Sequence, residues 1–347
     1  MATVSRKRPE WADALDPYAQ PTPWRTWLDI ATSVVPYLGL SVVMYLLLDV
    51  SYWLVLAVGI PASGFLLRTF ILFHDCTHGS LFHSRKANNR WGAVLGLLVM
   101  HPFSNWRWHH AFHHGSAGDL DRRGTGDVPT MTVAEYQSSG LGKRIGYWLF
   151  RHPVVMFGVG PIWSLVIGPR FMPKNPTKQM FRSVVLTNVA VIVMVVGLAV
   201  LLGPWNYFLV QGPTVFLAGT AGVWLFYVQH QFEDVYWENA DTWDYTEAAL
   251  QGSSYLNLRQ PLQFFTGNIG LHHVHHLNAR VPNYNLQRAH DENEIFHQVP
   301  VLTFWDGIRA TRLKLWDEEN GRLVTFAEAR RQARAKGVKA APAPTPG

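Results

Sequence analysis

The chain has 347 residues, of which 48% are hydrophobic, and a formal net charge of +6. Its only cysteine, Cys76, excludes an intrachain disulfide, a cysteine-ligated iron–sulfur cluster and a cysteine-rich zinc site. The basic residues form no stripe with interleaved aromatics, so we expect no nucleic-acid partner. The apolar residues are grouped in long uncharged runs separated by polar, histidine-rich stretches, which indicates an integral membrane protein.

A polar, basic N-terminal tail (residues 1–27) precedes the first of four apolar segments that are long enough to cross a bilayer. The connectors "DVSY" and "GPWNY" are very short, so the segments should form two helical hairpins. Arg68 lies near the end of the second segment, where its long side chain is expected to reach the lipid headgroups. The predicted transmembrane helices cover residues 28–48, 53–73, 184–202 and 207–228.

Two further apolar segments are weaker candidates. The stretch "WGAVLGLLVMHPF" from Trp91 is too short to span and suits a half-buried or re-entrant helix. Residues 145–167 include Arg151, His152 and prolines, so we interpret them as an interfacial segment, with a fifth span as the alternative.

The basic residues predict the orientation. Apart from Arg68, every Lys and Arg lies in the N-terminal tail, in residues 74–182 or after residue 228, and the hairpin connectors contain none. Positive charge marks the cytoplasmic side, so both termini and all the clustered histidines should be cytoplasmic. No cleavable signal peptide is expected. We predict one membrane domain over residues 28–310 and a C-terminal extension over 311–347, whose end, "AAPAPTPG", should be disordered.

Histidines are clustered at three places in the chain. "HDCTH" contains His74 and His78, four residues apart. "HAFHH" (residues 110–114) and "HHVHH" (residues 272–276) each contain the pattern H-x-x-H-H. Residues three and four apart share one face of a helix, so each cluster can direct several imidazoles at one point.

The histidines suit a metal site with two ions. Imidazole binds zinc, copper, iron and nickel, and one tetrahedral zinc would use only four ligands. The three histidine clusters contain no Glu-x-x-His pair of the kind found in carboxylate-rich di-iron bundles. An all-imidazole ligand set is neutral, which leaves the metals electrophilic and open to oxygen or water. Beside a membrane, this indicates chemistry on an apolar substrate, and no catalytic side chain is expected beyond the metal centre.

The three histidine clusters resemble the histidine boxes of the integral-membrane fatty acid desaturases. The strings "GDLDRRGTGDVPTMTVAEY", "YVQHQFEDVYW" and "QGSSYLNL" are similar to the omega-6 (Δ12-type) acyl-lipid branch. The resemblance covers roughly residues 30–310. It implies an all-α fold of four transmembrane helices with a cytoplasmic helical cap that carries the dimetal site.

The resemblance also implies an activity. An acyl-lipid or other fatty acyl substrate would enter a buried tunnel and lose two hydrogens to form a cis double bond. The cofactor would be two Fe ions with O2 as co-substrate. Two electrons would come from a separate donor, a ferredoxin or a cytochrome b5-like protein.

The family pattern implies nine metal ligands in this chain. They are His74, His78, His110, His113, His114, His230, His272, His275 and His276. His109 and His273 also have helical spacing to His113 and His276, so a register in which they are ligands stays open. In the favoured register they lie beside the ligands without binding metal.

Other polar residues near the boxes have weaker claims. Five carboxylates could accept the spare ring N–H of a ligand histidine, or be solvated loop charges: Asp75, Asp119, Asp121, Glu233 and Asp234. Asn268 could hold a metal-bound water, but a cap of the helix that starts near His272 is favoured. The basic residues Lys86, Arg107, Arg122 and Arg123 could meet lipid headgroups or an acidic donor, and a solvated surface is their default interpretation. No role is assigned to His83, His101, His152, His290 and His297.

Two alternatives stay open. Membrane di-iron hydroxylases and carotenoid ketolases have similar histidine boxes, and only the longer strings favour the desaturase. A histidine-rich metal transporter would need ionisable residues inside its spans, and these spans contain no His, Asp or Glu beyond their cytoplasmic ends. The sequence leaves open the double-bond position, the acyl carrier, the electron donor and the oligomeric state.

Overall fold

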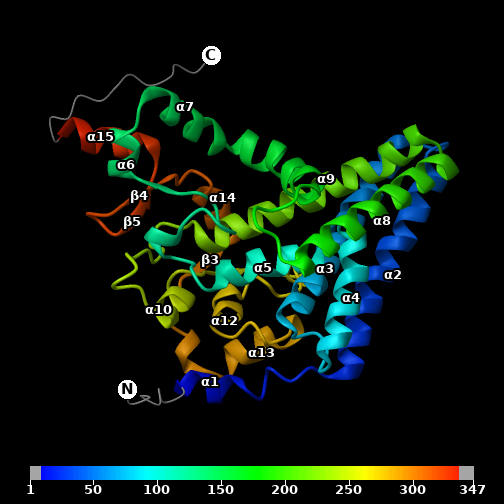
Figure 1. The fold of residues 1–347 in the computed structure, drawn as a ribbon, viewed down its shortest axis with the longest axis horizontal. Helices are drawn as coiled ribbons and strands as arrows, with labels where there is room; N and C mark the ends of the chain where they lie inside the picture. The colour runs from blue at the N-terminus through cyan, green and yellow to red at the C-terminus, as the bar shows by residue number, and fades with distance from the viewer. Residues whose placement is uncertain (1–8, 336–347) are drawn as a thin grey trace.

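The computed structural model describes residues 9–335. Four long apolar helices form one side of the molecule, and short helices and strands form a cap on the other (Figure 1). The predicted all-α membrane fold is therefore confirmed, with small β-sheets added in the cap.

Each predicted span lies inside one long helix. α2 is Pro23–Leu47, α3 is Tyr52–His78, α8 is Lys178–Leu202 and α9 is Pro204–His230, and all four are long and apolar enough to cross a membrane. α2 and α3 form one hairpin and α8 and α9 the other (Figure 1). α3 and α9 continue beyond the predicted apolar segments, so that their C-terminal turns carry histidines into the cap.

We predicted that the side chain of Arg68 reaches the lipid headgroups, and this prediction is wrong. Its side chain is buried and forms an ion pair with Asp29 of α2, and it also donates to the carbonyl of Phe264. A charge in this position is costly unless it is paired, and Asp29 supplies the pair. Arg68 thus links α3 to α2 and to the cap.

The two weaker apolar segments form shorter helices. α4 (Arg85–Leu98) has 14 residues, too short to span, as predicted. It packs closely on α3, because a Cβ at Gly96 would lie 3.0 Å from the ring of Phe73.

The second weak segment is bent. It comprises α7 (Leu141–Phe150) and the turns η2 (Val155–Val159), η3 (Ile162–Ile167) and η4 (Gly168–Arg170). The two halves meet at an angle of 57°, the geometry of a broken span or a re-entrant loop. The interfacial position of this segment stays a prediction.

The cap is built from many short elements. Its helices are α1 (Glu10–Leu15), α5 (Phe103–His114), α6 (Val133–Ser138), α10 (Tyr245–Leu250), α11 (Leu262–Phe265), α12 (His272–Leu277), α13 (Leu286–Asp291), α14 (Phe304–Ala310) and α15 (Phe326–Ala335). Single turns are η1 (Leu120–Arg122), η5 (Asn283–Asn285) and η6 (Glu294–Phe296). The core beneath them includes the fully buried Leu15, Leu271 and Phe296.

Two small sheets tie distant parts of the cap together. β1 (Met131–Thr132) pairs in parallel with β4 (Leu315–Asp317), which pairs antiparallel with β5 (Arg322–Val324). β2 (Tyr255–Asn257) pairs in parallel with β3 (Val301–Thr303). Residues 315–335 of the predicted C-terminal extension are therefore folded onto the cap. The predicted disordered end, 340–347, lies outside the described residues.

Candidate metal centre

The site is assembled from four helices that are far apart in the sequence. α3 and α9 bring histidines from the membrane side, and α5 and α12 bring them from the cap. On α3, α5 and α12 the histidines lie three or four residues apart, which brings their rings to neighbouring positions on the helix, and α9 supplies one histidine. All nine predicted ligands lie together, in two groups.

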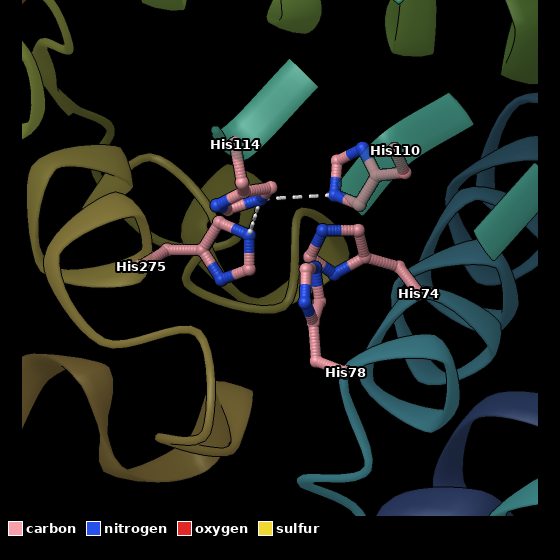
Figure 2. Close-up of side chains that lie close together, drawn as sticks. All are labelled: His74, His78, His110, His114 and His275. Atoms are coloured by element: carbon pink, nitrogen blue, oxygen red, sulfur yellow. Dashed lines mark hydrogen bonds between the residues drawn. The ribbon is translucent and has the colours of Figure 1, made fainter. Parts of the chain in front are cut away.

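The first group contains five histidines. In Figure 2 the rings from α3, α5 and α12 point at one another. The Nε2 atom of His114 lies 3.1 Å from that of His110 and 3.0 Å from that of His275. One ring nitrogen from each histidine lies within 4.8 Å of those of the others in the group His74, His78, His110, His114 and His275.

The second group contains four buried histidines. The Nε2 atom of His230 lies 3.1 Å from that of His113 and 2.9 Å from that of His272. His276 completes the group, again within 4.8 Å. The further ligand predicted between the last span and the third box, His230, is therefore beside the boxes, at the C-terminal end of α9.

The two groups are adjacent, and each doubled histidine is divided between them. His113 belongs to the second group and His114 to the first, and the same holds for His276 and His275. Successive residues on a helix point about 100° apart, so a His-His pair can serve two neighbouring ions. The rings of His114 and His276 stack with centroids 4.1 Å apart, which brings the two groups into contact.

The structure brings together the nine histidines of the favoured register. His273 is fully buried, but its Nε2 atom lies 3.0 Å from Nδ1 of His290, outside both groups. His109 is partly exposed and belongs to neither group. Neither belongs to a group of nitrogens that could share an ion, which fits the favoured register, and the ligand assignment stays a prediction.

The imidazoles are held in the form that binds metals. Burial is the largest cause that lowers the pKa of His110, His114 and His275 well below the usual value, and neighbouring histidines lower it further. Neutral rings keep a free nitrogen lone pair at pH 7. The ligand set therefore needs no deprotonation before it binds a cation.

The geometry fits metal ions. Imidazole nitrogens lie about 2.0–2.1 Å from a zinc ion, so two ligands at a right angle would be about 3.0 Å apart, close to the separations in both groups. Nε2 of His78 and Nε2 of His276 are buried and have no hydrogen-bond partner among the described residues. A cation in each group would supply the missing partner.

Backbone and side-chain groups outside the ligands hold some of the rings. Nδ1 of His230 lies 3.0 Å from the carbonyl oxygen of Gly252, which favours the tautomer with Nε2 free. Trp106 stacks on His110 with ring centroids 4.2 Å apart. Sequence reasoning missed both, because neither a carbonyl nor a nearby Trp has a recognisable motif.

Among the carboxylates proposed to support the ligands, Asp75 is the one beside them. It is buried, and its Oδ1 atom lies 3.5 Å from Nδ1 of His74. That nitrogen has no hydrogen-bond partner among the described residues, so Asp75 lies beside His74 without accepting its ring N–H. Its other oxygen accepts hydrogen bonds from the backbone and side-chain amides of Asn283, at 2.8 and 3.0 Å. Asn283 also donates to Asp29, so Asp75 connects the site to the Arg68 ion pair.

The other four carboxylates have different positions. Asp119 caps the η1 turn and pairs with Arg122, and Asp121 accepts from the backbone of Ala240. Glu233 pairs with Arg322 on the surface, and Asp234 is exposed. Asp121, Glu233 and Asp234 are therefore solvated charges, the second of the interpretations offered above. Asp119 fits neither interpretation, because it is buried and its partner is an arginine.

The sequence favoured Asn268 as the cap of α12, and this prediction is wrong. The N-cap position is Leu271, and no side chain caps the helix. Asn268 instead has a left-handed φ of 57° and donates to the carbonyl of Asn283, at 3.1 Å. The prediction fails because the chain makes a tight turn at Asn268, which directs its side chain to Asn283, and α12 begins only after Leu271.

An apolar cavity of about 910 Å³ leads to the histidines. Its walls come from α3, the bent segment and α9, and include Leu67, Phe70, Val215, Gly222 and Leu225. His74 and His110 of the first group and His272 of the second line the same cavity. Both groups therefore face the same apolar space.

The comparison with known families decides the class of protein. The model of the family "Fatty acid desaturase" matches residues 50–305. The chain belongs to the fatty acid desaturase family. It is therefore a membrane oxidoreductase that uses O2, and a metal transporter is not supported.

Several known desaturases are similar to this one. A "Fatty acid desaturase" of Bacillus subtilis is 40% identical over 93% of this chain and 92% of its own length. An "sn-1 oleoyl-lipid 12-desaturase" of Arthrospira platensis is 25% identical over 76% of this chain and 74% of its own. An "sn-1 acyl-lipid omega-3 desaturase (ferredoxin)" of Synechocystis is 27% identical over 63% and 62%.

The basic residues proposed to meet headgroups or a donor are mostly engaged within this desaturase. Arg122 pairs with Asp119, Arg123 with Glu135, and Arg107 donates to Asn89. Lys86 is exposed. A solvated, internally paired surface therefore describes them best.

Proposed function

We propose that this desaturase introduces a cis double bond into the acyl chain of a membrane lipid, at the Δ12 (omega-6) position, with a di-iron centre. The observation that carries the proposal is the shared cavity. Histidines of both groups line the same apolar space of about 910 Å³, so two ions would act on one chain. Imidazole suits iron among other metals.

When bound, the two irons would supply the activation of O2 that removes two hydrogens from adjacent methylenes. The nine histidines would hold them, five in one group and four in the other. The protein itself would bind and orient the acyl chain, because most of the cavity wall is apolar. The same wall excludes water from the reacting carbons.

Residues around the ligands keep the rings in place. The Gly252 carbonyl fixes the tautomer of His230, and Asp75 with Asn283 holds the end of α3 beside His74. A carbonyl that accepts the second ring N–H of a histidine orients this metal ligand and raises its basicity. Rigid placement matters because reaction at one C–H pair requires near-attack geometry.

We infer a separate electron donor, a ferredoxin or a cytochrome b5-like protein. The chain contains one cysteine, so it cannot hold a cysteine-ligated cluster of its own. The name of the Synechocystis relative includes ferredoxin, which supports the first of the two donors.

The Δ12 position rests on the string resemblance and on the 12-desaturase relatives, which are 25% and 26% identical. The omega-3 relatives match at similar identity. Product analysis must therefore locate the double bond as well as detect it.

The test is lipid profiling of a host that expresses the chain with a ferredoxin and its reductase. We expect new double bonds between carbons 12 and 13 of glycerolipid acyl chains, counted from the carboxyl carbon, and none with His275→Ala. A double bond elsewhere would reject only the position. Hydroxylated or ketonic products without new double bonds would favour the hydroxylase or ketolase alternative. Purified protein that holds only zinc, and is inert to O2 after iron loading, would reject the di-iron enzyme.

We also propose that both termini and the metal site face the cytoplasm. Lys and Arg mark the cytoplasmic side of a membrane protein, and here, apart from Arg68, they lie in the two ends of the chain and between the hairpins, with none in the hairpin connectors. The single cysteine, Cys76, is buried, so labelling of new cysteines has little background. Cysteines placed at Ser139 and Gln332 should react with a membrane-impermeant thiol reagent only after the cells are opened. Reaction in intact cells would reverse the orientation.

A further inference from the structure

Arg151 is a buried charge that the proposed function does not use. It lies at the bend between α7 and η2, and its side chain is fully buried. Burying a charge without a counter-ion is costly, and no carboxylate of the described residues interacts with this one. The charged or titratable side chains that interact with it there are Tyr147, Tyr227 and Lys314. The guanidinium group therefore depends on hydrogen bonds for its stabilisation.

These hydrogen bonds join three segments that are far apart in the sequence. Nη1 donates to the carbonyl of Pro129, at 2.9 Å, and to the hydroxyl of Thr130, at 3.1 Å. Nη2 donates to Oε1 of Gln231, at 2.6 Å, to the hydroxyl of Tyr227, at 3.1 Å, and to the carbonyl of Leu313, at 3.2 Å. Among its nitrogens, Nε alone has no partner within residues 9–335. The rigid, planar fork of an arginine reaches these divergent acceptors together, which the single nitrogen of a lysine cannot do.

Two of the acceptors belong to the last turn of α9. Tyr227 lies three residues before His230, and Gln231 directly follows it, at the position where α9 ends. Gln231 is buried, and its amide also donates to the hydroxyl of Thr130, at 3.1 Å. Arg151 therefore holds the turn that carries His230 through a residue on either side of this histidine.

The other acceptors include part of the cavity wall. Val128 and Pro129 line the apolar cavity, and residues 128–130 form neither helix nor strand. An irregular segment has no ladder of backbone hydrogen bonds to fix it, so its position depends on contacts such as those that Pro129 and Thr130 accept from Arg151. The same guanidinium group thus connects the acyl space to the helix turn with His230.

We propose that Arg151 is a positioning residue for the second group of histidines. It holds the last turn of α9 so that Nε2 of His230 stays beside those of His113 and His272. This inference rests on the proposed function, because it assumes that each group binds an ion. The first group takes its histidines from α3, α5 and α12 and none from α9. Loss of the fork should therefore weaken one of the two ions and spare the other.

The test measures the binding of each ion without catalysis. Anaerobic titration of the purified full-length protein with Fe²⁺, against a competing chelator, gives a dissociation constant for each ion. Arg151→Lys keeps the charge but loses the fork, and Gln231→Met removes the acceptor on α9 at similar size. Each should weaken one ion by about 10- to 100-fold, the range for residues that orient metal ligands, and leave the other unchanged.

A double variant identifies the affected ion. His230→Ala removes a ligand of the second group directly, so the ion that remains tightly bound belongs to the first group. Adding Arg151→Lys to His230→Ala should leave the constant of that remaining ion unchanged, because two changes that act through one contact are not additive. The matched control is Arg322→Gln. It removes an arginine that pairs on the surface with Glu233, three residues after His230, and should change neither constant.

Several results would overturn the proposal. Equal weakening of both ions by Arg151→Lys would indicate a general loss of structure, and so would a further loss in the His230→Ala background. Two unchanged constants in both Arg151→Lys and Gln231→Met would also reject it. If Arg151→Lys does not fold, Gln231→Met decides alone, because it leaves the bonds from Arg151 to Pro129 and Thr130 in place. Wild-type protein that binds no second ion would reject the proposed di-iron centre as well, whereas two ions in the wild type and in every Arg151 and Gln231 variant would reject this inference only.

Discussion

α3 and α8 are both apolar transmembrane helices, yet they have different structural roles. In their most apolar stretches 50% of α3 is buried inside the protein, against 11% of α8. α3 packs against α2, α4 and α9 and ends in two ligands of the first group, whereas Val193, Val200 and Leu201 of α8 are widely exposed. Hydropathy alone marks both as spans. The comparison teaches that one span is a scaffold for the site and the other mainly faces lipid.

We expect the largest effect on iron content and activity when a histidine of the first group is replaced. His275→Ala should lower iron content and reduce desaturation by more than about 100-fold, since even residues outside the ligand sphere change metal affinity 10- to 100-fold. Iron analysis and product yield would measure this. His83→Ala, in a residue outside both groups, is the matched control and should retain both.

The next effect concerns the buried ion pair of α3. Arg68→Leu leaves Asp29 buried without its cation, which should cost about 3–5 kcal/mol of stability. Thermal unfolding in detergent would measure it. The double variant Asp29→Leu/Arg68→Leu should recover much of the loss. Arg309→Leu breaks an exposed pair with Asp306 and should cost less than about 1 kcal/mol.

Asp75 tests the support of the first group. Asp75→Asn keeps the shape of the side chain but removes the charge beside His74. We expect iron affinity to fall about tenfold or more, measured by competition with a chelator. Asp234→Asn changes an exposed carboxylate and should leave the affinity intact. Equal affinities in the two variants would contradict a supporting role.

A glycine pair compares the cavity wall with the lipid face. A Cβ at Gly222 of α9 would meet only Leu67, at 3.6 Å, and Gly222 lines the cavity. Gly222→Leu should therefore place its side chain in the acyl space and lower turnover about 10- to 100-fold by misplacing the substrate. Gly197→Leu on α8, where a Cβ has no neighbour within 4 Å, should retain turnover.

The smallest effect is expected on α8. Val193 is 66% exposed, so Val193→Ala should change stability by less than about 0.5 kcal/mol. Thermal unfolding would again measure it. A loss of 2 kcal/mol or more would mean that a partner subunit covers this face, and α8 would then belong with the scaffold.

The sequence by itself determined the parts of this protein that depend on local spacing. Apolar run length placed all four spans, and the short connectors paired them into hairpins. The three clusters of candidate ligands followed from histidines three and four residues apart, because the α-helix puts such residues on one face. The family pattern then identified His230, which stands alone in the sequence.

Only the tertiary structure decided what depends on contacts between distant residues. Asp75 acquires its partner Asn283 from 208 positions away, and Arg68 finds Asp29 on the neighbouring helix instead of the headgroups. Asp119 and Glu233 are close to histidines in sequence, but their carboxylates turn to arginines. Likewise, which histidine of each doublet serves which group, and where the cavity ends, follow from how four helices converge. Helical periodicity depends only on residues a few positions apart, whereas these pairings form only when distant parts of the chain pack together.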